Sequence, residues 1–321
     1  MRLAARVSRG PSLALALALV AGCGVVDPSA ERALPPVVVR PLAPGEPALV
    51  IGVVGDTGTG RADQYEVAEA MARRVEREPW AFAVFLGDNF YMDGVASVDD
   101  PQWQTKFEDV YAAPSLRDLP CYAVLGNHDY QGNVQAQVDY SARSARWRMP
   151  ATHYAFEERL SDGTLVGFFM LDTTVLNPDT AQGQAHRAWL AEQLAASQAD
   201  WKVVCGHHPV YATCRKRPNH RTRMAAFLEQ TLIDGGVDLY LGGHDHVLEL
   251  SPSIEGVRYV TSGAGAGSDK AYPIEWSEAA EYVATGGGFV VLRVTREDLV
   301  IEFVRLAGET QYACTLRKYA R

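Results

Sequence analysis

The sequence predicts an α/β fold, and three features of its pattern support that prediction. Short apolar runs, typical of buried strands, alternate with stretches of helical spacing through most of the chain. After about residue 258 this alternation gives way to strands joined by short turns, which is typical of an antiparallel sheet. In addition, five of the predicted strands stop at a glycine that is followed by Asp, Asn or His. We therefore expect one α/β domain whose polar residues gather where strands end.

The first 22 residues have the pattern of an export signal and are left out of the fold. Three arginines precede an apolar stretch at 13–20, which is too short to span a bilayer as a helix. The following Val20-Ala21-Gly22-Cys23 resembles a bacterial lipobox. We expect Cys23 to become the first mature residue and to carry a lipid. That lipid would anchor the exported protein to the bacterial cell envelope, in the periplasm or on the outer surface. The alternative is an ordinary cleaved signal in which Cys23 is incidental.

Residues 23–47 contain six prolines and little periodicity, which indicates a tether between the lipid and the domain. The rest of the chain shows neither an internal repeat nor a signal for a second domain. We expect a signal peptide at 1–22, the tether at 23–47 and one domain at 48–321.

The α/β part of the domain is predicted from apolar runs of strand length. These runs are Ala48–Val54, Ala81–Leu86, Cys121–Leu125, Val166–Leu171, Lys202–Cys205 and Leu239–Leu241. The stretches with helical spacing between them are Gln64–Glu78, His186–Ser197 and Thr222–Asp234. In the first of these, Val67, Met71 and Val75 share one face, so we expect that face to be buried.

The antiparallel part follows the strand predicted at Arg258–Thr261. Its expected strands are Gly287–Val294, Leu299–Leu306 and Gln311–Leu316. The glycine-rich segments 263–267 and 286–288 are expected to be loops.

The formal net charge is −9 and the pI is about 5.4, which argues against a nucleic-acid-binding surface, since such surfaces are normally basic. Four cysteines follow Cys23, at Cys121, Cys205, Cys214 and Cys314. An even number permits disulfides in an oxidising compartment, and Cys205 and Cys214 are close enough in sequence to close a small loop. Free buried thiols are the alternative.

The polar residues after the predicted strands form five short motifs. They are Gly55-Asp56-Thr57-Gly58, Gly87-Asp88-Asn89-Phe90-Tyr91, Gly126-Asn127-His128-Asp129, Gly206-His207-His208 and Gly243-His244-Asp245-His246. Five of the eight histidines lie inside these motifs. Ligand sites of α/β sheets gather at the carboxyl ends of strands, and glycine there lets the backbone turn sharply. One such motif alone is usually a turn, but five in alternation with strands predict a single site.

Carboxylate, amide, imidazole and phenol side chains suit borderline or hard transition ions rather than a thiolate site. Two ions about 3.5–4 Å apart can bind the attacking and leaving oxygens of a phosphoryl displacement. They also lower the pKa of bound water, so hydroxide forms without a protein base. The motifs therefore predict a two-metal site, with the Asp88 carboxylate placed to bridge the ions.

The order of the motifs resembles the calcineurin-like metallophosphoesterases and, more narrowly, the purple acid phosphatases. The resemblance runs from about Leu49 to about Leu250 and includes Phe169-Met170-Leu171-Asp172 and His208-Pro209-Val210-Tyr211. It is nearest to the small, tartrate-resistant type. It implies an α/β four-layer sandwich of two mixed β-sheets flanked by helices, and an acid phosphatase that acts on small phosphomonoesters through a metal-bound hydroxide.

One position separates the subfamilies. Most metallophosphoesterases begin with Asp-x-His, in which the His is a ligand, whereas this chain has Asp56-Thr57-Gly58. Purple acid phosphatases place a tyrosinate where this chain has Tyr91. The resemblance thus implies two metal positions that share Asp88. The ligands of the first, expected to hold Fe3+, are Asp56, Asp88, Tyr91 and His246. The ligands of the second, expected to hold Fe2+, Zn2+ or Mn2+, are Asp88, Asn127, His207 and His244.

The resemblance also implies catalytic roles. His128 would bind the phosphate and assist the leaving group, with Asp129 fixing the orientation of its ring. The small type has another catalytic histidine on the loop after His208-Pro209, where this chain has a different, basic loop. His220 is the candidate for that role, and the cationic side chains of the loop are the alternative.

Two other functions stay open at this stage. A phosphodiesterase or nucleotide hydrolase would use the same metals with a pocket of different width. A non-catalytic surface lipoprotein would keep the fold as a binding module, although a decayed enzyme should have lost ligands and none is missing. Neither the oligomeric state nor the natural substrate follows from the sequence.

Overall fold

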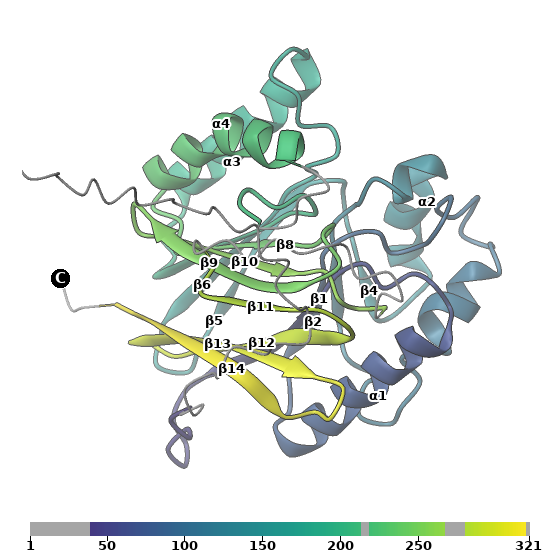
Figure 1. Cartoon of the computed structure of the whole chain (residues 1–321), viewed down its shortest axis with the longest axis horizontal. Helices are drawn as coiled ribbons and strands as arrows, with labels where there is room; N and C mark the ends of the chain where they lie inside the picture. Colours follow the sequence, from purple (N-terminus) through teal and green to yellow (C-terminus); the bar gives the residue numbers. More distant parts are fainter. Residues whose placement is uncertain (1–38, 213–217, 267–279, 319–321) are drawn as a thin grey trace, which may run out of the picture. The chain divides into compact units, whose positions relative to one another are not determined.

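The structure of the protein is a computed structural model that describes residues 39–212, 218–266 and 280–318, with backbone alone at 218–223. The described part of the chain contains two seven-stranded mixed sheets (Figure 1). The first sheet has the order β14-β13-β12-β1-β2-β3-β4. Its strands are β1 (Leu49–Val54), β2 (Phe82–Phe85), β3 (Cys121–Ala123), β4 (Trp147–Arg148), β12 (Gly288–Val294), β13 (Asp298–Arg305) and β14 (Thr310–Arg317).

The second sheet has the order β11-β9-β10-β8-β7-β6-β5. Its strands are β5 (Tyr154–Arg159), β6 (Leu165–Met170), β7 (Trp201–Cys205), β8 (Leu239–Gly242), β9 (Leu248–Ile254), β10 (Val257–Ser262) and β11 (Tyr282–Ala284). In the first sheet β1–β4 are parallel and reach one edge, while β12, β13 and β14 are antiparallel and form the other side. In the second sheet β6, β7, β8 and β10 form a parallel centre with antiparallel strands at both edges.

Apolar side chains from the two sheets meet in a common core. Phe82 of β2 contacts Phe156 of β5 and Phe168 of β6 edge to face, with ring centroids 5.6 and 5.3 Å apart. The indole nitrogen of Trp201 on β7 donates a hydrogen bond to the carbonyl oxygen of Thr295, which follows β12, at 2.8 Å. Aromatic pairs of this geometry add to the stability that area burial alone supplies. The two sheets therefore pack face to face.

Helices cover the outer faces of both sheets (Figure 1). Helix α1 (Ala62–Arg77) packs on the first sheet, and its predicted apolar face is buried as expected at Val67, Met71 and Val75. Helices α3 (Ala181–Ala196) and α4 (Pro218–Asp234) lie side by side on the second sheet. Four shorter helices lie in the connections after β2 and β3, namely η1 (Gln104–Glu108), η2 (Asp129–Gln131), α2 (Val134–Asp139) and η3 (Tyr140–Ala142). The predicted α/β class and two-sheet architecture are confirmed.

Most of the elements that the sequence pattern missed are short or lie at sheet edges. Strands β4, β5, β9 and β11 were not predicted, nor were the short helices η1, η2, α2 and η3. Strand β9 is the exception, since it has seven residues and lies inside the edge strand β11. Strand β5 is half exposed at the end of its sheet, so it has no continuous apolar run. The boundaries of the signal, tether and domain stay predictions, since residues 1–38 lie outside the described part.

Candidate metal centre

The candidate ligands lie directly after parallel strands, where the backbone is held in an uncommon conformation. Asp56, Asp88 and His244 have positive φ angles of 58°, 50° and 67°. Residues other than glycine rarely adopt positive φ angles, and backbone strain of this kind is concentrated at functional sites. The glycines beside the candidate ligands are needed mainly because the loops pack closely against one another. A Cβ on Gly126 would lie 2.2 Å from the carboxylate of Asp88, so the loops approach too closely for any side chain there.

The first group of donors comprises Asp56, Tyr91 and His246. The Tyr91 hydroxyl lies 2.9 Å from Asp56 Oδ1 and 3.1 Å from His246 Nε2. His246 Nε2 lies 3.4 Å from the same Asp56 oxygen. These side chains come from loops after β1, β2 and β8, and they converge as the sequence predicted.

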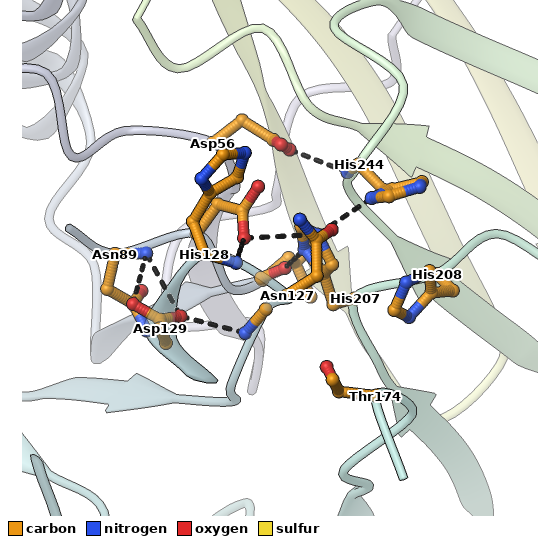
Figure 2. Close-up of polar contacts among 12 residues, drawn as sticks. Asp56, Asn89, Asn127, His128, Asp129, Thr174, His207, His208 and His244 are labelled. Carbon is orange, nitrogen blue, oxygen red and sulfur yellow. Dashed lines mark hydrogen bonds and ion pairs between the residues drawn. The ribbon is translucent and has the colours of Figure 1, made fainter. Parts of the chain in front are cut away.

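The second group comprises Asp88, Asn127, His207 and His244. Its centre is His207 Nε2, which lies 3.4 Å from Asp88 Oδ1, 3.3 Å from Asn127 Oδ1 and 3.0 Å from His244 Nδ1 (Figure 2). His207 Nδ1 faces the carbonyl oxygen of Leu86 at 2.8 Å. A carbonyl only accepts, so Nδ1 carries a proton, and Nε2 is the nitrogen that would bind a metal ion.

These distances fit metal ions. Donors that share an ion through bonds of about 2.0–2.2 Å lie roughly 3 Å from one another. Both groups show this spacing, and ligand atoms of Asp56, Asp88 and His207 lie within 4.8 Å of each other, which joins the two groups. Oxygen and imidazole donors without thiolate agree with a borderline or hard ion. The residues present therefore fit two adjacent cations, and the structure brings together all seven predicted ligands.

The charges in the site also favour a cation. Burial opposes ionisation of both Asp88 and His207, but their mutual attraction and hydrogen bonds outweigh it. The pKa of Asp88 is consequently lowered, and that of His207 is raised to about 9. Burial, followed by the charges of Asp56 and Asp88, raises the pKa of Tyr91 well above its ordinary value. A cation among these oxygens would act in the opposite direction and favour the phenolate.

His128 lies beside this centre, where the sequence placed it. Its backbone N–H donates to Asp88 Oδ1 at 2.8 Å, and its ring contacts that of Tyr91 with centroids 4.7 Å apart. Ring nitrogen Nδ1 lies 2.7 Å from the carbonyl oxygen of Met92. The sequence pattern did not single out Met92, whose side chain is 63% exposed.

The expectation that Asp129 orients the His128 ring is corrected by its contacts. The buried Asp129 carboxylate accepts the backbone N–H of Asn89 (Figure 2). The backbone N–H groups of Phe90 and Gly126 donate to it as well. It also accepts from the side-chain amide of Gln137 at 2.9 Å. Asp129 therefore joins the loops after β2 and β3, while the carbonyl of Met92 orients the imidazole. Burial, followed by the charge of Asp88, raises the pKa of Asp129 to about 6.

Some of the residues predicted from the sequence lie outside the part of the chain that the structure describes. The side chain of His220 and all of Cys214 are among them. The described cysteines Cys121, Cys205 and Cys314 are free thiols, the first two buried. Within the described ranges no helix has the length and apolar character needed to cross a bilayer.

Comparison with known proteins gives consistent results. Residues 49–248 match the family described as calcineurin-like phosphoesterase. Human "tartrate-resistant acid phosphatase type 5" is 33% identical over 303 residues, covering 86% of this chain and 93% of the human protein. "Purple acid phosphatase 4" of Arabidopsis thaliana is 32% identical over 282 residues, covering 80% of each chain.

Solved structures show the same architecture. "GAP50 the anchor in the inner membrane complex of Plasmodium" superposes with a TM-score of 0.78 at 26% identity, covering 86% of this chain and 90% of that one. The purple acid phosphatase PPD1 from yellow lupin seeds has a TM-score of 0.65 at 15% identity, covering 85% of this chain and 54% of that one. The lupin likeness concerns the fold alone.

Proposed function

Because the chain belongs to the calcineurin-like phosphoesterase family and, within it, to the purple acid phosphatases, we propose that it hydrolyses small phosphomonoesters at a binuclear metal centre. The observation that supports this most directly is the convergence of seven donors in two groups that meet at Asp56, Asp88 and His207. None of the ligands expected for such a centre is replaced in this sequence.

The two donor groups differ in chemistry, which suggests different ions. The first group has carboxylate and phenol oxygens around one imidazole, and we assign it Fe3+. The second has two imidazoles and an amide, and we assign it a divalent ion, Fe2+, Zn2+ or Mn2+. Bound ions would supply Lewis acidity that polarises the phosphate and lowers the pKa of the attacking water. Since ferric iron acidifies water strongly, we expect the optimum on the acid side of neutrality.

The chain's own part in the reaction is to bind and orient the phosphate. His128 is held through Nδ1 by the Met92 carbonyl, so Nε2 is the ring atom left to contact a phosphate oxygen or the leaving group. Asp129 holds together the loops that present Asp88 and Asn127. These residues fix the geometry before substrate arrives, which is what makes electrostatic stabilisation effective.

The first test is hydrolysis of para-nitrophenyl phosphate by the full chain loaded with iron and a divalent ion, from about pH 4 to about pH 9. Asp88→Asn is the test variant. His153→Phe is the matched control, since the hydrogen bond and ring contacts of His153 are made with Thr152, His186 and Trp189, which are not among the assigned ligands. We expect acid-side activity in the wild type and in the control and its loss in Asp88→Asn. Faster hydrolysis of bis(para-nitrophenyl) phosphate would favour a diesterase. Bound metals without either activity would favour a binding module.

The metal assignment has its own test. Tyr91→Phe removes the phenol oxygen and preserves the ring, so it should lower the iron content measured after purification without chelators. The divalent content should change less. Equal loss of both metals would contradict the assignment of Tyr91 to one ion.

We also propose that the protein is exported and lipid-anchored through Cys23, on the basis of the basic region, the short apolar stretch and Val20-Ala21-Gly22-Cys23. Cys23→Ser should abolish incorporation of a labelled fatty acid and move the protein from the membrane fraction to the soluble one. Unchanged membrane association without label would contradict the anchor.

A further inference from the structure

The proposed divalent site takes its ligands from both sheets. Asp88 and Asn127 follow β2 and β3 of the first sheet, whereas His207 and His244 follow β7 and β8 of the second. Asn127 Oδ1 and His207 Nε2 lie 3.3 Å apart where the two sheets meet. Metal–ligand distances stay within about 0.2 Å of their preferred values, so one ion can bind both atoms only if the two loops keep this spacing.

A hydrogen bond between Tyr130 and Asp172 joins the same two sheets. Tyr130 lies on η2, three residues after Asn127, and Asp172 lies two residues after the end of β6. The Tyr130 hydroxyl donates to Asp172 Oδ2 at 2.5 Å. Asp172 is fully buried and Tyr130 is half-buried. The roles assigned above use neither side chain.

The Asp172 end of this hydrogen bond is connected to His207. Asp172 Oδ1 accepts the backbone N–H of Thr174 at 3.0 Å, so the side chain closes a tight turn around Thr173. Thr173 Oγ1 in turn accepts the backbone N–H of His207 at 3.1 Å. The position of Asp172 is therefore passed through one turn to the backbone of a metal ligand.

The Tyr130 end is connected to Asn127 through a short, internally bonded segment. Within it the N–H of Gln131 donates to the carbonyl oxygen of His128, and the N–H of Gly132 donates to that of Asp129. The Asp129 carboxylate accepts the N–H of Gly126 at 2.8 Å. Residues 126–132 thus form one bonded unit, and a shift of Tyr130 would shift the Asn127 side chain with it.

We propose that Tyr130 and Asp172 are positioning residues for the divalent ion, and that their hydrogen bond holds the loop that carries Asn127 at ligand distance from the loop after β7. The proposal rests on the binuclear centre of the proposed function and extends it to a pair of residues behind the ligands. The ferric site has a separate connection between the sheets, since Asp56 Oδ2 accepts the backbone N–H of His244 at 2.7 Å. Loss of the Tyr130 hydrogen bond should therefore weaken the divalent site selectively.

The test measures the affinity of Mn2+ for the full, iron-loaded chain by calorimetry, with iron content determined in parallel. Tyr130→Phe removes only the hydroxyl. Residues that orient metal ligands contribute about 10-fold to 100-fold in metal affinity, and Tyr130 acts through a loop, so we expect a loss of about 10-fold in Mn2+ affinity with iron retained. Tyr122→Phe makes the same exchange on β3, where the ring packs against Phe82 and Phe156, and should leave the affinity unchanged.

A second set of variants tests whether the effect depends on the hydrogen bond itself. Asp172→Asn keeps a polar partner, because its amide N–H can donate to the Tyr130 oxygen, so Mn2+ should bind nearly as in the wild type. Asp172→Ala removes the partner and should lower the affinity by the same factor as Tyr130→Phe. The double variant of Asp172→Ala and Tyr130→Phe should lose no more than either single variant, because both substitutions break one interaction.

Unchanged Mn2+ affinity in Tyr130→Phe would overturn the proposal. Losses that add up in the double variant would overturn it too, as would an equal loss of iron, because both results indicate general loosening of the fold rather than positioning of one site. Metal binding is measured without turnover. A wild type that binds both ions but hydrolyses no ester would therefore contradict the proposed function and leave this inference standing.

Discussion

The imidazole of His128 donates from Nδ1 to the carbonyl oxygen of Met92, across 2.7 Å. A carbonyl oxygen can only accept, so this contact fixes the proton on Nδ1 and turns Nε2 away from the backbone. Met92 directly follows the predicted ligand Tyr91, so one peptide segment supplies a metal donor and orients the neighbouring phosphate-binding ring.

Removal of the His128 ring should lower kcat by about 100-fold or more, the usual contribution of a positioned proton-transfer or phosphate-binding group. We expect this for His128→Ala in steady-state hydrolysis of para-nitrophenyl phosphate, with metal content unchanged. His128→Gln places a polar group near the position of Nε2 and should be less impaired. If both variants kept wild-type kcat, or if His128→Ala lost metal, the assigned role would be wrong.

Asp129 should contribute chiefly to stability. Its carboxylate accepts three backbone N–H groups and the Gln137 amide, and Asp129→Asn replaces one acceptor oxygen with a donor that faces other donors. Leaving buried groups unpaired costs about 1–3 kcal/mol each, so we expect a loss of at least about 2 kcal/mol in the free energy of unfolding. Denaturant titration of the metal-free protein measures it.

The control for this prediction is Asp118→Asn, because the Asp118 side chain is 87% exposed and pairs only with its neighbour Arg117 among the described residues. Its effect should stay within about 0.5 kcal/mol. Equal effects of the two substitutions would show that the contacts of Asp129 contribute nothing particular.

The strands and ligands that could be predicted are those marked by a local pattern in the sequence. Continuous apolar runs marked the parallel strands, because a strand buried on both faces has no polar positions. The glycine–polar pairs marked the ligands, since the parallel strands of a sheet end at one edge. The ligands follow β1, β2 and β3 of the first sheet and β7 and β8 of the second, so the site lies where these two edges meet. Edge strands such as β5 were missed because half of their residues face solvent, which removes the apolar run.

Contacts between distant segments could not be predicted in this way. Periodicity shows which face of an element is buried but not which residue lies opposite. The hydrogen bond between His207 Nδ1 and the Leu86 carbonyl spans 121 positions, and the ion pair of Arg74 with Glu302 joins residues from opposite ends of the domain. The hydrogen bond from the backbone N–H of His207 to Thr173 Oγ1 likewise depends on β6 and β7 being neighbours, which the sequence did not show.

Lys106 also joins segments that are distant in the sequence. Its substitution should impair catalysis although its side chain does not contact the substrate. Its ammonium group on η1 donates to the carbonyl oxygen of Tyr91 and to Gln102 Oε1, the latter at 2.6 Å. Gln102 in turn donates to the carbonyl oxygen of Gly94 at 2.8 Å. Both ends of segment 91–94 are thus tied to the same helical turn. Displacement of a catalytic group by about 1 Å can cost 100-fold in rate.

We expect Lys106→Met to lower kcat by about 10-fold with little change in KM, because the donor is lost while the length of the side chain is kept. Lys106→Arg retains a cationic donor and should recover most of kcat, which a purely structural loss would not allow. Steady-state kinetics of the metal-loaded wild type and variants measure these changes in kcat and KM. Equal impairment of the Met and Arg variants would contradict a role for the donated hydrogen bond.

Asp172 makes the stability of the metal-free protein depend on pH in a specific direction. Burial is the main cause that raises the pKa of this carboxyl group to about 6, against the hydrogen bonds from Tyr130 and the backbone of Thr174. In the unfolded chain the pKa is about 3.9. Because the folded-state value is the higher one, folding favours the protonated form. That contribution is complete below about pH 4 and is lost as the pH rises through about 6.

The amide of Asp172→Asn does not ionise, so the variant should gain stability relative to the wild type as the pH rises. A shift of about two pKa units corresponds to about 1–3 kcal/mol between pH of about 4 and about 7. Unfolding of the two metal-free proteins, measured by denaturant at both ends of this range, isolates the difference because all other titrating groups are shared. Asp118→Asn again serves as the exposed control and should show no such trend. A pH-independent difference between Asp172→Asn and the wild type would mean that Asp172 stays ionised in the folded protein, held by a charge such as that of His207 more strongly than burial opposes it.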